Sequence, residues 1–133
     1  MSLKFKATTP CYKFINASPE EQLAKLREEV EEVAQAWSVY SADKTAENLQ
    51  QLLVELLDVK ACVNTAMAQI HKDNDTENTK RGTMNLAEAR KQMTDPATER
   101  KFFPLLDFRH HKSRAKSKVI DKNLRRGYYC EEK

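Results

Sequence analysis

Four carboxylates stand out by their spacing: Glu29 and Glu32 in one segment, Glu55 and Asp58 in another. The members of each pair are three residues apart, so on a helix they project from one face on neighbouring turns. Glu55 and Asp58 interrupt residues 49–70, the most apolar run of the chain. Burying two like charges there costs on the order of several kcal/mol each unless a cationic side chain, a raised pKa or a metal ion compensates. Clustered carboxylates suit Mg²⁺, with Mn²⁺ as the alternative, and Mg²⁺ commonly serves reactions at phosphate.

The first pair has a competitor, because the segment also contains Glu28 and Glu31. On a helical wheel, Glu29 and Glu32 lie on the shoulder of the apolar stripe, whereas Glu28 and Glu31 point almost opposite to it. We therefore expect Glu29 and Glu32 to face a packed neighbour. Two other interpretations remain open at this point. The glutamates could form a solvated face, or Glu55 and Asp58 could form a structural ion pair with one of three cations: Lys25, Arg27 or Lys60.

Two long helices must position these carboxylates. Ser18-Pro19-Glu20-Glu21 is a typical helix start, with a serine cap, a proline in the first turn and a capping-box glutamate. Apolar residues then recur at steps of three and four, which predicts a helix over about residues 19–41 and a core-packing role for Trp37 and Tyr40. A second helix is predicted from near Thr45 to about His71, apolar on nearly every side and therefore buried. Packed antiparallel, the two helices would bring all four carboxylates together.

The remainder of the chain is more polar. Residues 71–83, which contain Gly82, predict a loop, and a capping box at Asn85 predicts a short helix to about Met93. Asp95-Pro96 ends that helix and starts another turn, and Pro104 interrupts again. A basic helix over about residues 109–126 should end at Gly127. We thus expect a single domain over residues 1–133, with a core at 18–72, a loop with short helices at 73–108 and a basic C-terminal helix at 109–129.

Composition supports an all-α fold, because charged residues make up 32% of the chain and glycine occurs only twice. No run is apolar enough to span a membrane, and the N-terminal residues lack the apolar core of a signal peptide, so we expect a cytoplasmic protein. Cys11, Cys62 and Cys130 lack zinc-ligand spacing, which predicts reduced thiols. Charge is uneven along the chain, with a net of −5 over residues 1–77 and +8 over residues 78–133.

The carboxylate pattern resembles a known family. Glu28-Glu29-Val30-Glu31-Glu32 followed by Glu55-Leu-Leu-Asp58 is similar to the Glu-Glu-x-x-Glu and Glu-x-x-Asp motifs of the MazG-like, all-α NTP pyrophosphohydrolases of phages and bacteria. The ending Lys122-Asn-Leu-Arg-Arg-Gly-Tyr-Tyr129 resembles the tail of such proteins. Glu31 departs from the motif, because glycine is common at that position. The resemblance covers residues 20–70 and 119–129, and not 72–118.

The resemblance implies a Mg²⁺-dependent nucleoside triphosphate pyrophosphohydrolase that cleaves a (d)NTP to the (d)NMP and pyrophosphate. By motif position, the metal would be held by the catalytic carboxylates Glu29, Glu32, Glu55 and Asp58. The substrate would be bound by residues of the basic tail: Lys122, Arg125, Arg126 and Tyr128. Members of this family form homodimers or homotetramers, which would complete the helical bundle and cover the apolar second helix.

A second interpretation comes from charge alone. Residues 109–118, RHHKSRAKSK, form a basic stripe typical of nucleic-acid binding, although no aromatic residues are interleaved for base stacking. On this interpretation the chain is a non-catalytic helical nucleic-acid-binding or interaction protein that uses its C-terminal helix. The stripe could instead pair with the acidic helix of a neighbouring subunit.

Overall fold

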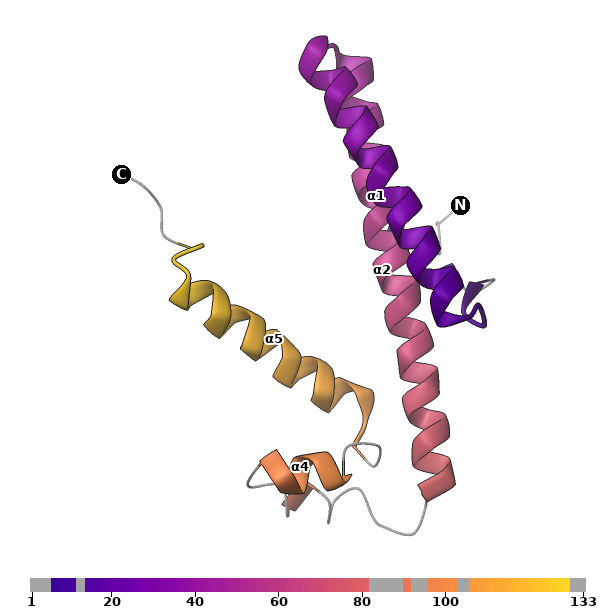
Figure 1. Cartoon of the computed structure of the whole chain (residues 1–133), viewed down its shortest axis with the longest axis vertical. Coiled ribbons are helices and arrows are strands. Elements are labelled where there is room, and N and C mark those ends of the chain that lie inside the picture. Colours follow the sequence, from indigo (N-terminus) through magenta and orange to yellow (C-terminus); the bar gives the residue numbers. More distant parts are fainter. Residues whose placement is uncertain (1–5, 12–13, 82–89, 92–95, 103–105, 130–133) are drawn as a thin grey trace. The chain divides into compact units, whose positions relative to one another are not determined.

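The computed structural model describes residues 6–11, 14–81, 90–91, 96–102 and 106–129. In these ranges the regular structure is helical and contains no strand, which confirms the all-α prediction. The helices are α1 (Pro19–Ala42), α2 (Ala46–Arg81), α4 (Pro96–Phe102) and α5 (Phe108–Arg125) (Figure 1). No described helix is both long and apolar enough to cross a membrane.

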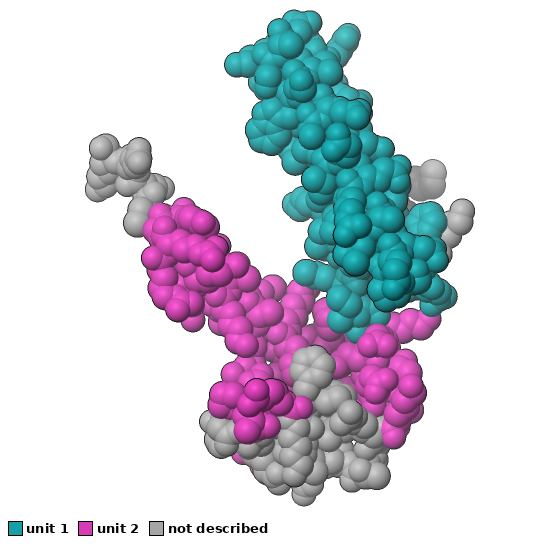
Figure 2. Space-filling view, in the orientation of Figure 1, with its two compact units in different colours: residues 1–70 teal, residues 71–133 magenta. Residues whose placement is uncertain are grey.

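The chain falls into two compact units, residues 1–70 and residues 71–133, which Figure 2 colours teal and magenta. The first unit contains α1 and most of α2, and the second contains the end of α2 together with α4 and α5. The prediction of one domain over residues 1–133 stays a prediction.

Both helix starts in the first unit follow from their caps. The Ser18 hydroxyl accepts a hydrogen bond from the Glu21 backbone N–H at 3.1 Å, and Pro19 occupies the first turn of α1. The Thr45 hydroxyl accepts from the Asn48 N–H at 3.2 Å just before α2. The start of each helix and the end of α1 therefore confirm the boundaries predicted from the sequence within one residue.

Within the first unit, α1 and α2 run antiparallel and side by side (Figure 1). The face of α1 that is buried is not the centre of its apolar stripe, because Glu29 is 7% exposed while the adjacent Val30 is 51% exposed. The buried positions Gln22 and Glu29 lie about 80–100° around the helix from the line through the exposed apolar residues. We call that line the α1 ridge; it consists of Leu23, Val30 and Trp37. The expectation that Trp37 packs in a core is wrong within the single chain, because α2 covers only the neighbouring face.

The second helix also differs from the prediction of a helix buried on all sides. Leu52 is buried, yet several large apolar residues of α2 are between 38% and 58% exposed: Leu49, Leu53, Val54, Leu57, Met67 and Ile70. The reason is geometric, since α1 covers one side of α2 and the short N-terminal segment covers a little more. That segment is held by the Thr65 hydroxyl, which accepts from the Cys11 N–H at 2.9 Å, and by Asn64, whose amide donates to the Thr8 carbonyl at 2.8 Å.

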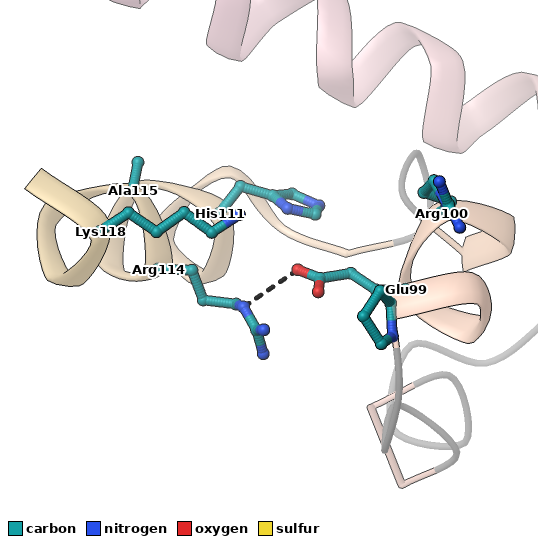
Figure 3. A pocket seen from close by; sticks show the side chains of 7 residues that line it. Glu99, Arg100, His111, Arg114, Ala115 and Lys118 are labelled. Atoms are coloured by element: carbon teal, nitrogen blue, oxygen red, sulfur yellow. Dashed lines mark ion pairs between the residues drawn. The ribbon is translucent and has the colours of Figure 1, made fainter. Parts of the chain in front are cut away.

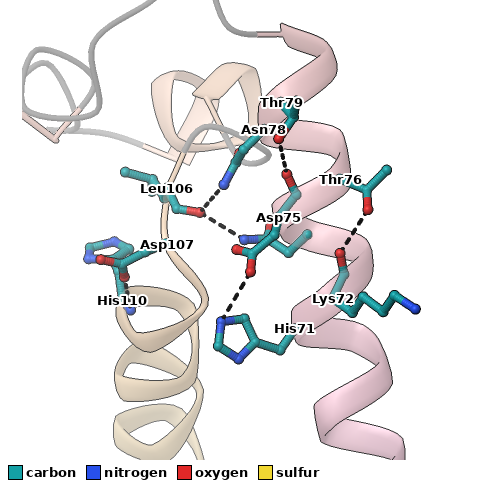
Figure 4. A network of polar contacts seen from close by, with 10 residues as sticks. His71, Lys72, Asp75, Thr76, Asn78, Thr79, Leu106, Asp107 and His110 are labelled. Carbon is teal, nitrogen blue, oxygen red and sulfur yellow. Dashed lines mark hydrogen bonds and ion pairs between the residues drawn. The ribbon is translucent and has the colours of Figure 1, made fainter. Parts of the chain in front are cut away.

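The loop predicted at residues 71–83 is wrong up to Arg81, because α2 continues to that residue. No proline or glycine occurs between Ala46 and Gly82, and polar side chains support the extension within the second unit (Figure 4). The amides of Asn74 and Asn78 both donate to the Leu106 carbonyl, at 3.0 and 3.2 Å. These long-range bonds fix a polar stretch as helix, which local sequence signals did not indicate.

The last helix matches its prediction. Asp107 caps α5 by accepting from the His110 N–H at 2.8 Å, and it also pairs with Arg90. The helix ends at Arg125, and Gly127 follows with φ 71°, a left-handed conformation that favours glycine. Of the predicted helix from Asn85 to Met93, only residues 90–91 are described, and they are helical. Pro104 and Cys130 lie outside the described residues.

Candidate metal centre

Three of the predicted carboxylates meet between α1 and α2. Glu29 and Glu32 come from α1 and Glu55 from α2, and one oxygen from each lies within 4.8 Å of the others. Antiparallel packing produces this meeting, because it places the middle of α1 against the first third of α2. The wheel-based choice between glutamates agrees with their burial, since Glu28 and Glu31 are exposed whereas Glu29 is buried and Glu32 is half-buried.

Two oxygens of the cluster are buried without a hydrogen-bond partner: Oε2 of Glu29 and Oε2 of Glu55. Each of these residues uses its other oxygen. Glu29 Oε1 lies 2.9 Å from the Lys25 ammonium, and Glu55 Oε1 accepts from the Gln51 amide at 2.7 Å. A buried carboxylate oxygen left unpaired is costly, so each residue has one oxygen held in place and one that lacks a partner.

Asp58 stands beside this group and not inside it. It is absent from the set of oxygens that meet within 4.8 Å, and it is exposed. Asp58 and Glu29 instead share the wall of a neighbouring pocket of about 250 Å³. The other lining residues are mostly small or apolar: Cys11, Phe14, Gln22, Lys25, Ala61, Cys62 and Thr65. The sequence did not single out this pocket, because it depends on how the N-terminal segment lies against α2.

The cluster perturbs its own ionisation. The negative charge of Glu29 is the main cause that raises the pKa of Glu32, followed by desolvation and by the neighbouring Glu55 carboxylate. Desolvation is the main cause that raises the pKa of Asp58, and the charges of Glu29 and Glu55 add to it. Hydrogen bonding to Glu29 raises the pKa of Lys25. The three glutamates thus repel one another, and the Lys25 pair with Glu29 offsets only part of that repulsion.

Comparison with known proteins adds no relative. No protein-family model, no curated protein and no solved structure matches this chain. The chemistry of the cluster is therefore argued from its own residues.

The residues present fit a hard divalent cation. The donors are carboxylate oxygens, two of them are buried and unpartnered, and they come from two helices that hold them close together. Lys25 forms a structural ion pair, which was one interpretation of the sequence, but its partner is Glu29 and not Glu55 or Asp58. It neutralises one charge among three, so the ion pair does not account for the whole cluster.

The predicted substrate-binding residues lie at the end of α5 and just beyond it, in the second unit: Lys122, Arg125, Arg126 and Tyr128. All four are exposed. The Arg126 guanidinium lies 5.8 Å from the centre of the Tyr128 ring, and the Tyr129 hydroxyl accepts from the Asn123 amide at 3.1 Å. The roles of these residues at the carboxylate cluster stay predictions.

Proposed function

We propose that this chain is a Mg²⁺-dependent nucleoside triphosphate pyrophosphohydrolase that converts a (d)NTP to the (d)NMP and pyrophosphate. The observation that carries the proposal is the pair of buried, unpartnered oxygens on Glu29 and Glu55, within a cluster that also includes Glu32. These three residues would hold the ion, with Mn²⁺ as the alternative, and Asp58 would complete the site from the rim of the adjoining pocket. The MazG-like resemblance of the same four residues supports the choice of reaction.

The ion, when bound, would neutralise phosphate charge and lower the pKa of a water molecule. The chain itself supplies orientation. Gln51 holds one oxygen of Glu55, and Lys25 holds one oxygen of Glu29, so the second oxygen of each would remain available to the ion. In the reaction, a water oxygen bonds to the α-phosphorus while the bond from that phosphorus to the α,β-bridging oxygen breaks. Pyrophosphate leaves, and the proton of the water passes to a carboxylate.

The pocket beside Glu29 and Asp58 suits the part of the substrate that is not phosphate. Its wall contains Phe14, Ala61 and Cys62 as well as the two carboxylates. A nucleotide bound there would contact apolar surface on one side and the cluster on the other. Lys122, Arg125, Arg126 and Tyr128 would contact the phosphates or the nucleoside, as the resemblance implies.

We further propose that the active form is a homodimer or homotetramer. The α1 ridge and the exposed apolar face of α2 support this, since both consist of large side chains left open in the single chain. A second copy that packs its hairpin on these faces would bury them.

Sedimentation of the wild type should give a mass at least twice that of the chain, and Val30→Glu should reduce it to the mass of the monomer. A monomeric wild type would contradict this assembly. The cytoplasmic location stays a prediction.

The decisive experiment is release of pyrophosphate, measured with a coupled inorganic pyrophosphatase over a panel of NTPs and dNTPs with Mg²⁺. Glu55→Gln and Asp58→Asn should abolish turnover while the circular dichroism spectrum stays helical. Glu28→Gln and Glu31→Gln are matched controls on exposed positions of α1 and should retain activity. If the wild type hydrolyses none of the nucleotides, and Mg²⁺ leaves its melting temperature unchanged, the proposal is wrong.

A further inference from the structure

Helix α5 carries a row of cations along one face. Arg114, Lys118, Lys122 and Arg125 follow one another at steps of four, four and three residues, which places them within an arc of about 80°. All four are exposed. Successive members are about one turn apart, so the row presents a positive charge roughly every 5–6 Å over about 16 Å. We call these four residues the α5 row.

A pocket extends one end of the α5 row. It lies between α4 and α5, has a volume of about 500 Å³ and is open to solvent (Figure 3). Arg114 and Lys118 line it from α5 and Arg100 lines it from α4, together with His111, Pro96 and Ala115. The only lining carboxylate is Glu99, and it already pairs with the Nε of Arg114 at 3.0 Å. Three cations against one paired carboxylate leave the pocket positively charged.

The rest of α5 helps to identify the ligand. The three exposed large apolar residues of the helix, Val119, Ile120 and Leu124, are centred on the side opposite to the α5 row. A protein groove or a lipid surface that took up the apolar side of α5 would leave the α5 row facing away from it. The ligand of the row itself must therefore be recognised by charge. A chain of regularly spaced anions fits better, and each strand of DNA presents a phosphate about every 3.4 Å.

We propose that the α5 row, together with Arg100 in the adjoining pocket, binds the phosphate backbone of a nucleic acid without reading its sequence. The guanidinium of Arg114 has five N–H donors, so the bond to Glu99 leaves it able to contact phosphate. This surface goes beyond the proposed hydrolase activity. Lys122 and Arg125 are also candidates for substrate phosphates, so the test changes neither of them.

The test measures fluorescence anisotropy of labelled single-stranded and duplex oligonucleotides with the full-length protein. The row variant is Arg100→Gln with Lys118→Gln, two exposed positions. It should weaken binding on the order of tenfold at about 50 mM salt and reduce the slope of log affinity against log salt by about two. The matched control is Lys112→Gln with Lys116→Gln, which removes the same charge from the opposite side of α5 and should change binding far less. Glu99→Gln, which removes the only carboxylate of the pocket, should strengthen binding.

Three results would overturn the proposal. The first is absence of oligonucleotide binding by the wild type at low salt. The second is an equal loss of oligonucleotide affinity in the row variant and in the control, which would mean that binding depends on net charge and not on the α5 row. The third is a row-dependent preference for poly-glutamate or phosphatidylserine vesicles over nucleic acid. Because the effect of Glu99→Gln is a gain, a folding defect in the row variant would still leave the proposal testable.

Discussion

The carboxylate cluster and the network around Leu106 both use polar side chains of α2. They differ in whether those side chains repel one another or form hydrogen bonds. In the first unit, Glu29, Glu32 and Glu55 bring like charges together, and two buried carboxylate oxygens remain unpartnered. In the second unit, Asn74 and Asn78 donate to one carbonyl. Among the residues that the structure describes there, the unpartnered buried side-chain atoms are an amide oxygen and an imidazole nitrogen: Asn78 Oδ1 and His110 Nε2.

The pKa directions express the same difference. Repulsion from Glu29 raises the pKa of Glu32, whereas hydrogen bonding from His110, and then from Arg90, lowers the pKa of Asp107. Ionised Asp107 is thus stabilised by the fold and ionised Glu32 is destabilised by it. The contrast sets a region that stabilises the chain by itself against a region whose charge repulsion an added cation would relieve.

The largest expected effect is that of the cation. At a free Mg²⁺ concentration a hundredfold above Kd, the free energy of unfolding should rise by about 2.7 kcal/mol. Glu29→Gln should abolish this gain, and Glu28→Gln should preserve it. Denaturant unfolding with Mg²⁺ and with EDTA measures the difference. Equal stabilisation of both variants would place the ion elsewhere.

The next largest effect on stability is expected from removal of a buried amide that donates a hydrogen bond. Asn74→Ala deletes the buried amide that donates to the Leu106 carbonyl and should lower the free energy of unfolding by about 1–3 kcal/mol. The exposed neighbour Asp73→Ala is the control, with an expected change within about 0.5 kcal/mol. Mg²⁺ should not alter the cost of Asn74→Ala. A Mg²⁺-dependent cost would mean that the two regions do not behave independently.

Loss of the charge on the α5 cap should have a smaller effect on stability. Asp107→Asn keeps a capping side chain but removes the charge that pairs with Arg90. The folded-state pKa of Asp107 is lowered, so its contribution to stability is present above the unfolded pKa of about 3.9 and is lost as pH falls through the folded pKa. The wild type should therefore lose more stability on acidification than Asp107→Asn does. Equal losses of stability in the wild type and in Asp107→Asn would show that the charge of Asp107 contributes nothing to stability.

The smallest effect has the opposite sign. The folded-state pKa values of Glu32 and Asp58 are raised, so in EDTA their contribution favours folding at low pH and is lost as pH rises through those values. Glu32→Gln should therefore raise the melting temperature of the metal-free protein at neutral pH, and the gain should shrink on acidification. The exposed control Glu31→Gln should change the melting temperature little at either pH. A lower melting temperature for Glu32→Gln would contradict mutual repulsion in the cluster.

The sequence predicted the features that depend on local patterns. The Ser18 cap, the start of α2, the end of α5 at Gly127 and the choice of Glu29 over Glu28 all follow from neighbouring residues. The extension of α2 to Arg81 could not be predicted in this way, because Asn74 and Asn78 are bonded to Leu106, about thirty residues away. The wheel also placed the contact face of α1 on its apolar stripe, whereas the face that meets α2 is turned toward Glu29. That rotation depends on how the two helices fit together, and no local signal encodes it.

The α1 ridge sets the geometry of any helix that covers it. Leu23, Val30 and Trp37 are seven residues apart, and on a straight helix such positions drift by about 20° per repeat. A partner helix that follows all three must therefore wind around α1 in a left-handed supercoil, at a shallow crossing angle of about 20° and not the steeper angle of about 50° common in globular proteins. Trp37, the largest side chain of the ridge, would then act as a knob that fixes the register of the wrapped helices.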